Sequence, residues 1–289
     1  MAHVSRRRFL QLAGSGLLIA QSSYLIAQPS KRKVGVALLG LGNYSTNLLA
    51  PALQHTQHCE LRGIITGSED KIPQWQKQYG IKDRNVYTYS TMAEIANNDD
   101  IDVIYVVTPT GTHKDFAVQA ANTGKHVWCE KPMAMDSEEC QAIIDACNKN
   151  GVQLSIGYRM QHEPNTRTFH QYLETKPYGN ITAVSSFAGY AGQGRASDNW
   201  RMKKHMGGGA LYDMGVYAIN GARFLTGREP VSVTGSHPPK RFPDKFTEVD
   251  ETTLFTMDFG DGLVADCGTS VVEGFNHFKA DCENGWYQL

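Results

Sequence analysis

Lys131 is the residue whose type and setting most clearly suggest chemistry. It stands in the run Cys129-Glu130-Lys131-Pro132, directly after the short apolar segment 126–129. If that segment is a strand of an open α/β sheet, its carboxyl end lies in the crevice where such sheets bind ligands, and the lysine enters that crevice. Pro132 restricts the backbone beside the lysine and helps to aim its side chain. The surrounding pattern therefore decides whether Lys131 is a solvated loop residue or part of a site.

A glycine-rich turn is the second feature with chemical meaning. Gly40-Leu41-Gly42-Asn43-Tyr44-Ser45 follows the apolar run 34–39 and precedes a segment with helical character. Gly40 would permit a tight turn, and Gly42 would let the backbone approach a pyrophosphate bound at the start of the helix. Ser45 stands where such motifs usually have their third glycine. The turn predicts a dinucleotide-binding site formed by residues 40–45.

The end of the second predicted strand bears on which nicotinamide cofactor binds. An acidic side chain there binds the ribose 2′-hydroxyl of NAD, whereas small polar and basic side chains leave room for the 2′-phosphate of NADP. The chain has Thr66-Gly67-Ser68 with Lys71 nearby, although the acidic pair 69–70 lies between them. We expect Gly67, Ser68 and Lys71 to contact the cofactor. The pattern favours NADP as that cofactor, with NAD as the alternative.

These residues need a sheet to position them, and the sequence from residue 33 alternates strand and helix signals. Strands are expected at 34–39, 61–66, 102–108, 126–129 and 153–156, with helices between them. Near-continuous β-branched and apolar runs are typical of parallel strands that are covered on both faces. Capping boxes are expected at Thr91 with Glu94 and at Asp136 with Glu139. The pattern predicts a Rossmann-type parallel sheet over residues 33–157, in an α/β fold.

The pattern changes after about residue 158. Helices are expected at 163–174 and 209–225, and strands at 181–190, 231–236, 252–259 and 263–271. Gly260-Asp261-Gly262 separates the last two strands and predicts a hairpin. Residues 158–289 therefore form an α+β domain on a mostly antiparallel sheet. Because the sequence stops in mid-pattern at 286–289, we expect this domain to be incomplete and the C-terminus truncated.

Composition describes an ordinary globular protein. The chain has 289 residues, 41% of them hydrophobic and 20% charged, which suits one large domain or two smaller ones. The formal net charge of −1 gives no sign of a nucleic-acid partner or of a polybasic membrane surface. Six cysteines show no CxxC pair and no metal-ligand spacing, so we expect buried, inert free thiols and no metal site.

The N-terminus has the features of an export signal. Arg6-Arg7-Arg8 precedes the modestly apolar run 12–27, which is too short and too weakly apolar for a stable membrane anchor. Paired arginines before such a run match the twin-arginine signal, and a Sec signal or a basic tail is the alternative. We expect residues 1–27 to direct export of the folded protein to the periplasm, with cleavage after Ala27. This route suits a protein that must load a cytoplasmic cofactor before it leaves.

Taken together, the motifs over about residues 33–289 resemble the Gfo/Idh/MocA oxidoreductase family, and most closely its glucose–fructose oxidoreductase branch. The resemblance is carried by the following stretches: Gly40-Leu41-Gly42, Thr108-Pro109-Thr110-Gly111-Thr112-His113, Glu130-Lys131-Pro132, Gly157-Tyr158-Arg159, Trp200-Arg201, and residues 207–217 from Gly207 to Tyr217. It implies a second domain with a large, open sheet that serves substrate binding and homo-oligomer formation. It also implies a tightly held NADP and twin-arginine export.

The resemblance also assigns roles to particular residues. It places the family's catalytic lysine at Lys131, its aspartate at Asp213 and its tyrosine at Tyr217. The spacing agrees, because residues four apart on a helix share one face. The same resemblance assigns to the cofactor site, in addition to Lys131 and to the residues of the two segments described above, Thr108, Pro109, His113, Glu130, Arg159, Trp200 and Arg201. Of these, Arg159, Trp200 and Arg201 are expected near the nicotinamide or the substrate.

The implied chemistry is hydride transfer between the nicotinamide ring and a sugar or polyol carbon that bears a hydroxyl. Tyr217 is the expected acid/base, because an ammonium nearby at Lys131 would make the phenol more acidic. Lys131 would donate to the reacting oxygen, and Asp213 would hold a substrate hydroxyl or orient Lys131. Two alternatives stay open: a nicotinamide-dependent glycosidase of the same family, and a non-catalytic nicotinamide-binding protein.

Overall fold

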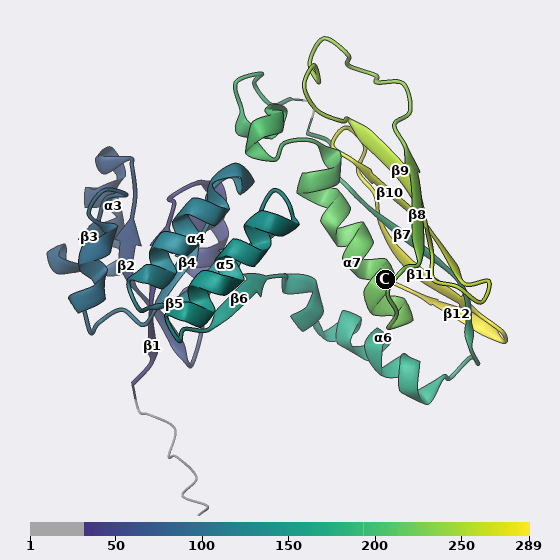
Figure 1. Cartoon of the computed structure of the whole chain (residues 1–289), viewed down its shortest axis with the longest axis horizontal. Coiled ribbons are helices and arrows are strands. Elements are labelled where there is room, and N and C mark those ends of the chain that lie inside the picture. Colours follow the sequence, from purple (N-terminus) through teal and green to yellow (C-terminus); the bar gives the residue numbers. More distant parts are fainter. Residues whose placement is uncertain (1–31, 193) are drawn as a thin grey trace, which may run out of the picture.

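Two β-sheets lie at opposite ends of the molecule in the computed structural model, which describes residues 32–192 and 194–289 (Figure 1). The predicted export signal at residues 1–27 lies outside the described residues. Within those described ranges, no helix is both long enough and apolar enough to cross a membrane.

The first sheet is the predicted Rossmann-type sheet. Its six strands are parallel throughout and follow the order β3-β2-β1-β4-β5-β6. The strands are β1 Val34–Leu39, β2 Cys59–Ile65, β3 Val86–Tyr87, β4 Val103–Val106, β5 His126–Glu130 and β6 Leu154–Gly157. The helices that connect them are α2 Ala50–Leu53, α3 Ile72–Tyr79, α4 His113–Asn122 and α5 Ser137–Lys149. The chain crosses between the two halves of this sheet at β1 and β4, so ligands are expected at that crevice.

Apolar clusters cover both faces of this sheet, as continuous apolar strands require. One face packs against α4 and α5 through side chains that include Ile104, Val127 and Ile143. The other face packs against α2 and α3 through Leu38, Ile64 and Trp75, among others. The strand ends are thereby fixed, which holds the loops after β1, β4 and β5 in place around the crevice.

The second sheet is mixed but mostly antiparallel, as predicted. Its strand order is β12-β11-β7-β10-β9-β8, and only the β7–β10 pair is parallel. The strands are β7 Ile181–Gly189, β8 Ser232–Ser236, β9 Thr252–Asp258, β10 Val264–Ser270, β11 Asn276–Cys282 and β12 Gly285–Gln288. The predicted hairpin is confirmed, because β9 and β10 pair antiparallel across residues 259–263.

Helices cover one face of the second sheet. These are α6 Pro164–Thr175 and α7 Val216–Thr226, and α7 lies on the side of the sheet that faces the first domain (Figure 1). Their side chains bury Phe255, Met257 and Tyr287. Alternation along the strands turns Leu254 and Trp286 to the opposite face, where they are 44% and 59% exposed. Because α7 faces the first domain, the turn that precedes it, Leu211–Gly215, can reach the crevice.

Several sequence-based expectations are wrong in detail. The helix after the glycine turn, which the sequence pattern predicts from about residue 45 to residue 57, ends at Leu53. Thr91 makes no side-chain cap, whereas the Asp136 carboxylate accepts the Glu139 amide at 2.8 Å as predicted. All six cysteines are free, and burial raises the pKa of each thiol, but Cys59, Cys140 and Cys282 are only half-buried.

Candidate active site

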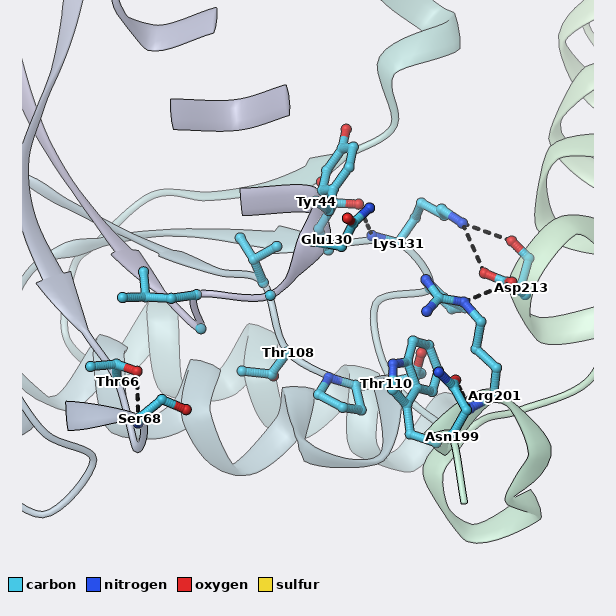
Figure 2. Close-up of a pocket in the computed structure, with 18 of the residues that line it drawn as sticks. Tyr44, Thr66, Ser68, Thr108, Thr110, Glu130, Lys131, Asn199, Arg201 and Asp213 are labelled. Atoms are coloured by element: carbon cyan, nitrogen blue, oxygen red, sulfur yellow. Dashed lines mark hydrogen bonds and ion pairs between the residues drawn. The ribbon is translucent and has the colours of Figure 1, made fainter. Parts of the chain in front are cut away.

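A cavity of about 610 Å³ lies where the carboxyl ends of β1, β4 and β5 face the segment that leads into α7. Residues from both domains line it, which gives the first domain one wall and the second domain the other (Figure 2). The lining comprises Gly40–Tyr44, Thr66, Ser68, Lys71, Tyr89, Val107–Thr110, Glu130–Pro132, Arg195, Asn199–Arg201, Asp213 and Tyr217.

The glycine turn forms one end of this cavity. Gly40 has a φ of +95°, and a Cβ there would lie 2.5 Å from the Val107 carbonyl oxygen, so only glycine fits. A Cβ on Gly42 would meet no atom within 4 Å, which leaves open space over the backbone. Ser45 is fully buried and does not line the cavity. Its hydroxyl points back into the turn and donates to the Gly40 carbonyl at 2.6 Å. The serine at the third glycine position therefore stabilises the turn through a hydrogen bond on its buried side.

The end of β2 lies beside this turn. Thr66 is buried, and its hydroxyl accepts the Ser68 amide at 2.9 Å. Lys71 donates to the Leu41 carbonyl at 3.0 Å, so its ammonium lies against the glycine turn. Ser68 and Lys71 line the cavity, whereas the acidic pair 69–70 is exposed to solvent outside it. Gly67 makes room for the Tyr89 ring, since a Cβ there would lie 2.9 Å from that ring.

His113 lies behind the cavity wall and not in it. It is 1% exposed, and its two ring nitrogens lie 2.8 Å from the carbonyl oxygens of Thr108 and Pro132. Burial lowers the pKa of His113, while hydrogen bonds to these carbonyls oppose that shift. His113 thus ties the loop after β4 to the loop after β5, and Thr108 and Pro109 of the first loop line the cavity.

Glu130 is a buried carboxyl at the end of β5. It accepts a hydrogen bond from the Tyr105 hydroxyl, and its other oxygen accepts the Lys131 amide at 3.2 Å. Burial raises the pKa of Glu130, against the opposing effects of Tyr105 and Lys131. The Tyr44 ring lies close to Glu130 in the cavity wall (Figure 2), and burial, followed by the charge of Glu130, raises the pKa of Tyr44 to about 12.

Lys131 reaches across the cavity to the second domain. Its Nζ donates to the Asp213 main-chain carbonyl at 2.7 Å and lies 3.9 Å from the Asp213 carboxylate oxygen Oδ1 (Figure 2). The same Nζ lies 4.5 Å from the centroid of the Tyr217 ring. The Lys131 side chain is 12% exposed, so its charge is largely shielded from solvent.

One oxygen of the Asp213 carboxylate, Oδ2, is occupied by donors of the protein itself. It accepts from the Tyr190 hydroxyl at 2.6 Å and from Arg201 Nε at 2.9 Å, and Arg195 Nη1 lies 3.7 Å away. Of the two roles expected for Asp213, orientation of its cationic neighbours matches this geometry better than capture of a substrate hydroxyl.

Tyr217 lies in the first turn of α7, which begins at Val216, directly after the turn Leu211–Gly215. That turn is π-helical, yet Asp213 and Tyr217 both still line the cavity. The ammonium of Lys131 faces the Tyr217 ring, whereas a hydrogen bond to the Tyr217 side chain raises the pKa of Arg159. Arg159 does not line the cavity and instead lies beside Tyr217, with its guanidinium carbon 5.8 Å from the ring centroid.

Some residues of the site have no sequence signal of their own. Tyr190, Arg195 and Asn199 belong to the irregular segment between β7 and α7, where no periodicity indicates which side chains turn inward. Tyr89 follows the very short β3 and was not expected to line a cavity. Their places depend on how the chain packs in three dimensions.

The described residues fit a dinucleotide. The open space over Gly42, the tight turn at Gly40 and the cation at Lys71 form one end, and the interdomain cluster of Lys131, Asp213 and Tyr217 forms the other. Among the described residues, no group of His, Cys, Asp and Glu side chains could hold a metal ion.

Solved structures with this fold include two instructive examples. The aldose–aldose oxidoreductase of Caulobacter crescentus, solved in complex with glycerol, is 34% identical, with a TM-score of 0.85 over 89% of this chain and 76% of that one. The apo scyllo-inositol dehydrogenase of Lactobacillus casei is 21% identical, with a TM-score of 0.77 over 90% of this chain and 75% of that one, and it shows the fold alone.

Curated relatives are longer than this chain. The NADP(+) D-xylose 1-dehydrogenase of Haloarcula marismortui is 28% identical over 247 residues, which are 82% of this chain and 66% of that protein. A second such enzyme, from Haloferax volcanii, is 27% identical over 66% of this chain and 56% of its own length. The chain therefore spans between about half and two thirds of these two relatives.

Two family models cover most of the sequence. Residues 34–158 match the model described as an oxidoreductase family with an NAD-binding Rossmann fold, and residues 166–288 match the GFO/IDH/MocA C-terminal domain. These two matches, on consecutive domains that have the expected folds, show that the chain belongs to the Gfo/Idh/MocA family of oxidoreductases.

Proposed function

We propose that the protein transfers hydride between a nicotinamide cofactor and a hydroxyl-bearing carbon of a sugar or polyol. The observation that carries this proposal is the meeting of Lys131, Asp213 and Tyr217, from two domains, in the cavity that begins at the glycine turn. The names of the relatives support it, since they describe oxidoreductases of aldoses and xylose. The likeness to the aldose–aldose oxidoreductase also supports our proposal that the protein belongs to the glucose–fructose oxidoreductase branch of the family.

The roles of the side chains follow from their contacts. When bound, the cofactor supplies the hydride acceptor or donor. In the oxidation direction, Tyr217 acts as the base in its phenolate form, and its oxygen takes the proton of the substrate hydroxyl. Arg159 donates a hydrogen bond to the Tyr217 side chain. Lys131 donates to the reacting oxygen while negative charge develops on it. Asp213 holds Lys131 and Arg201 in position.

NADP is the cofactor that we propose, because Ser68 and Lys71 line the cavity where the acidic pair 69–70 does not. Replacing Lys71 with methionine is expected to weaken NADP binding by about 10- to 100-fold, the usual loss for one hydrogen bond to a charged group. NAD binding should change much less, because NAD has no 2′-phosphate. The measurement is a titration of both cofactors by fluorescence, with Lys77→Met on the exposed side of α3 as the control. Equal losses for NADP and NAD would contradict the assignment of Lys71.

Gly40 tests the cofactor turn itself. Gly40→Ala places a Cβ 2.5 Å from the Val107 carbonyl and forces an alanine to a φ of +95°. We expect cofactor affinity to fall by at least about tenfold, because the positive φ alone costs roughly 1–2 kcal/mol and the clash displaces the turn. Gly80→Ala is the matched control, since Gly80 also has a positive φ, +67°, but meets no atom within 4 Å and ends α3. Cofactor titrations that fail to separate these two variants would refute the role of the turn.

Export and assembly complete the proposal. Residues 1–27 would direct twin-arginine export to the periplasm, and Arg7→Lys with Arg8→Lys should retain the protein in the cytoplasm.

The helix-free face of the second sheet, with Leu254 and Trp286, would form a homo-oligomer interface. Light scattering of the purified protein gives the assembled mass, and a monomer would rule out that interface.

The activity is tested by adding NADP to the purified protein and following nicotinamide absorbance while aldoses, ketoses and polyols are titrated. Sugar-dependent reduction is the expected result. Release of free sugar from a glycoside without net reduction would indicate the nicotinamide-dependent glycosidase instead. Cofactor binding without any turnover would indicate a non-catalytic protein.

A further inference from the structure

Two arginines stand together at the substrate end of the cavity. Arg195 and Arg201 both line it, and each side chain is 31% exposed. They share one carboxylate oxygen, Asp213 Oδ2, which lies 2.9 Å from Arg201 Nε and 3.7 Å from Arg195 Nη1. Two guanidinium groups therefore share a single carboxylate oxygen as their anionic partner.

Charge at this end is not balanced by the described residues. Lys131 also faces Asp213, so three cations surround one carboxylate. Glu130 does not neutralise the arginines, because its oxygens accept from the Tyr105 hydroxyl and the Lys131 amide. Burial lowers the pKa of Arg195, and the charge of Arg201 adds to that effect, while Asp213 opposes it. An anion placed between the two guanidinium groups would relieve this repulsion.

Several donors of these arginines remain available. Among the described residues, the Arg201 side chain donates only through Nε, to Asp213, and the Arg195 side chain donates only through Nη1, to the Tyr190 hydroxyl. The Arg201 guanidinium extends from the Asp213 contact into the space beside Lys131 (Figure 2). Planar guanidinium groups with paired free donors match the oxygens of a carboxylate or a phosphate.

The residues proposed to bind the phosphates of the cofactor lie elsewhere in the cavity. The glycine turn and Lys71 lie at one end of the cavity, together with Thr66 and Ser68. Figure 2 shows Thr66 and Ser68 at the left, and Arg201 with Asp213 at the right beyond Thr108. The arginine pair is thus on the substrate side of the cavity.

We propose that the substrate is a sugar or polyol that carries an anionic group, a carboxylate or a phosphate ester, and that Arg195 and Arg201 bind this group. The bound anion would then orient the reacting hydroxyl toward Lys131 and Tyr217. The proposal rests on the hydride transfer proposed above and narrows its substrate class.

Matched substrates test the proposal on the cofactor-loaded protein. Glucose is compared with glucuronate and with glucose 6-phosphate, and galactose with galacturonate, so that the carboxylate and the phosphate are separated. At least one anionic substrate should have a kcat/KM about tenfold or more above its neutral counterpart, and added salt should reduce that advantage. A neutral sugar that is preferred in every pair would overturn the proposal.

Arg195→Gln shows whether the preference comes from this arginine. The ratio of anionic to neutral kcat/KM should fall by about 10- to 100-fold, as expected for the loss of one charged hydrogen-bonding partner. Arg228→Gln is the control, because Arg228 lies outside the cavity and pairs with Asp261 at 3.0 Å. Equal losses on anionic and neutral sugars would mean that Arg195 only supports Tyr190 and Asp213, which would overturn its role in anion binding.

A binding measurement separates this inference from the proposed reaction. The Arg201 guanidinium stacks on the Trp200 ring at 4.2 Å, so an anion bound there should change Trp200 fluorescence. Trp200→Phe identifies that signal. Saturable quenching by glucuronate or glucose 6-phosphate, without hydride transfer from any sugar to NADP, would retain the anion site and reject the reaction. Turnover of sugars without a preference for anionic ones would retain the reaction and reject the anion site. Equal quenching by sulfate would reject selectivity for sugar anions.

Discussion

Replacing Tyr217 with phenylalanine is expected to lower kcat by about 10²- to 10⁴-fold, the usual range for loss of a general acid/base. The phenol oxygen is the atom that would exchange the substrate proton, and phenylalanine keeps the ring on which Lys131 Nζ lies at 4.5 Å. Cofactor binding should therefore persist. Steady-state rates measured alongside cofactor titrations give both quantities on the same preparation.

Tyr158 provides a matched control. Its ring packs edge-on against Tyr217 with centroids 5.8 Å apart, but its hydroxyl donates to the Val216 carbonyl and does not line the cavity. Tyr158→Phe should affect stability more than turnover. If Tyr217→Phe retained the kcat of the unmodified protein, another group would have to carry the proton.

Lys131→Met is expected to lower kcat/KM by about 10²- to 10³-fold, the range found when one donor to a developing oxyanion is removed. Methionine keeps much of the side-chain volume but cannot donate to the reacting oxygen. The fold should survive, because Asp213 keeps its contacts with Arg201 and Tyr190 and so is not left as an unpaired buried charge.

Lys125→Met is the control for Lys131→Met, since Lys125 donates to the Asn98 carbonyl outside the cavity. Thermal unfolding checks that both variants are folded. Near-normal turnover in Lys131→Met, or loss of turnover only through unfolding, would exclude Lys131 from the chemistry.

Much of the first domain could be predicted because its signals are local. The runs that became β1 and β4 are apolar along their whole length, as strands covered on both faces must be. Gly40 has the positive φ that its place in the motif requires. By contrast, β3 has only two residues, which is too short for any pattern to show.

The second domain was harder to predict in its last part. In β11 the buried residues Phe278 and Ala280 alternate with polar His277 and Lys279 on the uncovered face. That alternation is weak, and the strand is stabilised by pairing with β7, which lies about 100 residues earlier (Lys279 opposite Ser185). Such strands form because a distant partner is present, and no local signal records that partner.

The residues of the site differ in the same way: some have a local sequence signal, and others take their place only through distant contacts. Lys131 could be placed at a strand end from sequence alone, whereas its partners in the second domain came from a family resemblance. The environment of Asp213 could not be foreseen, because Tyr190 and Arg195 come from an irregular segment. The resemblance left two roles open for Asp213, to hold a substrate hydroxyl or to orient Lys131, and the structure shows its Oδ2 occupied by protein donors.

Direct detection of hydride transfer is the sharpest test of the proposed function. The protein is incubated with NADP and with sugars or polyols deuterated at the carbinol carbon, and the recovered cofactor is examined by mass spectrometry. Deuterium on the nicotinamide ring, lost in Tyr217→Phe and Lys131→Met, is the predicted result. A cofactor that stays free of deuterium with every neutral and anionic substrate, while the protein remains folded and binds NADP, would contradict it.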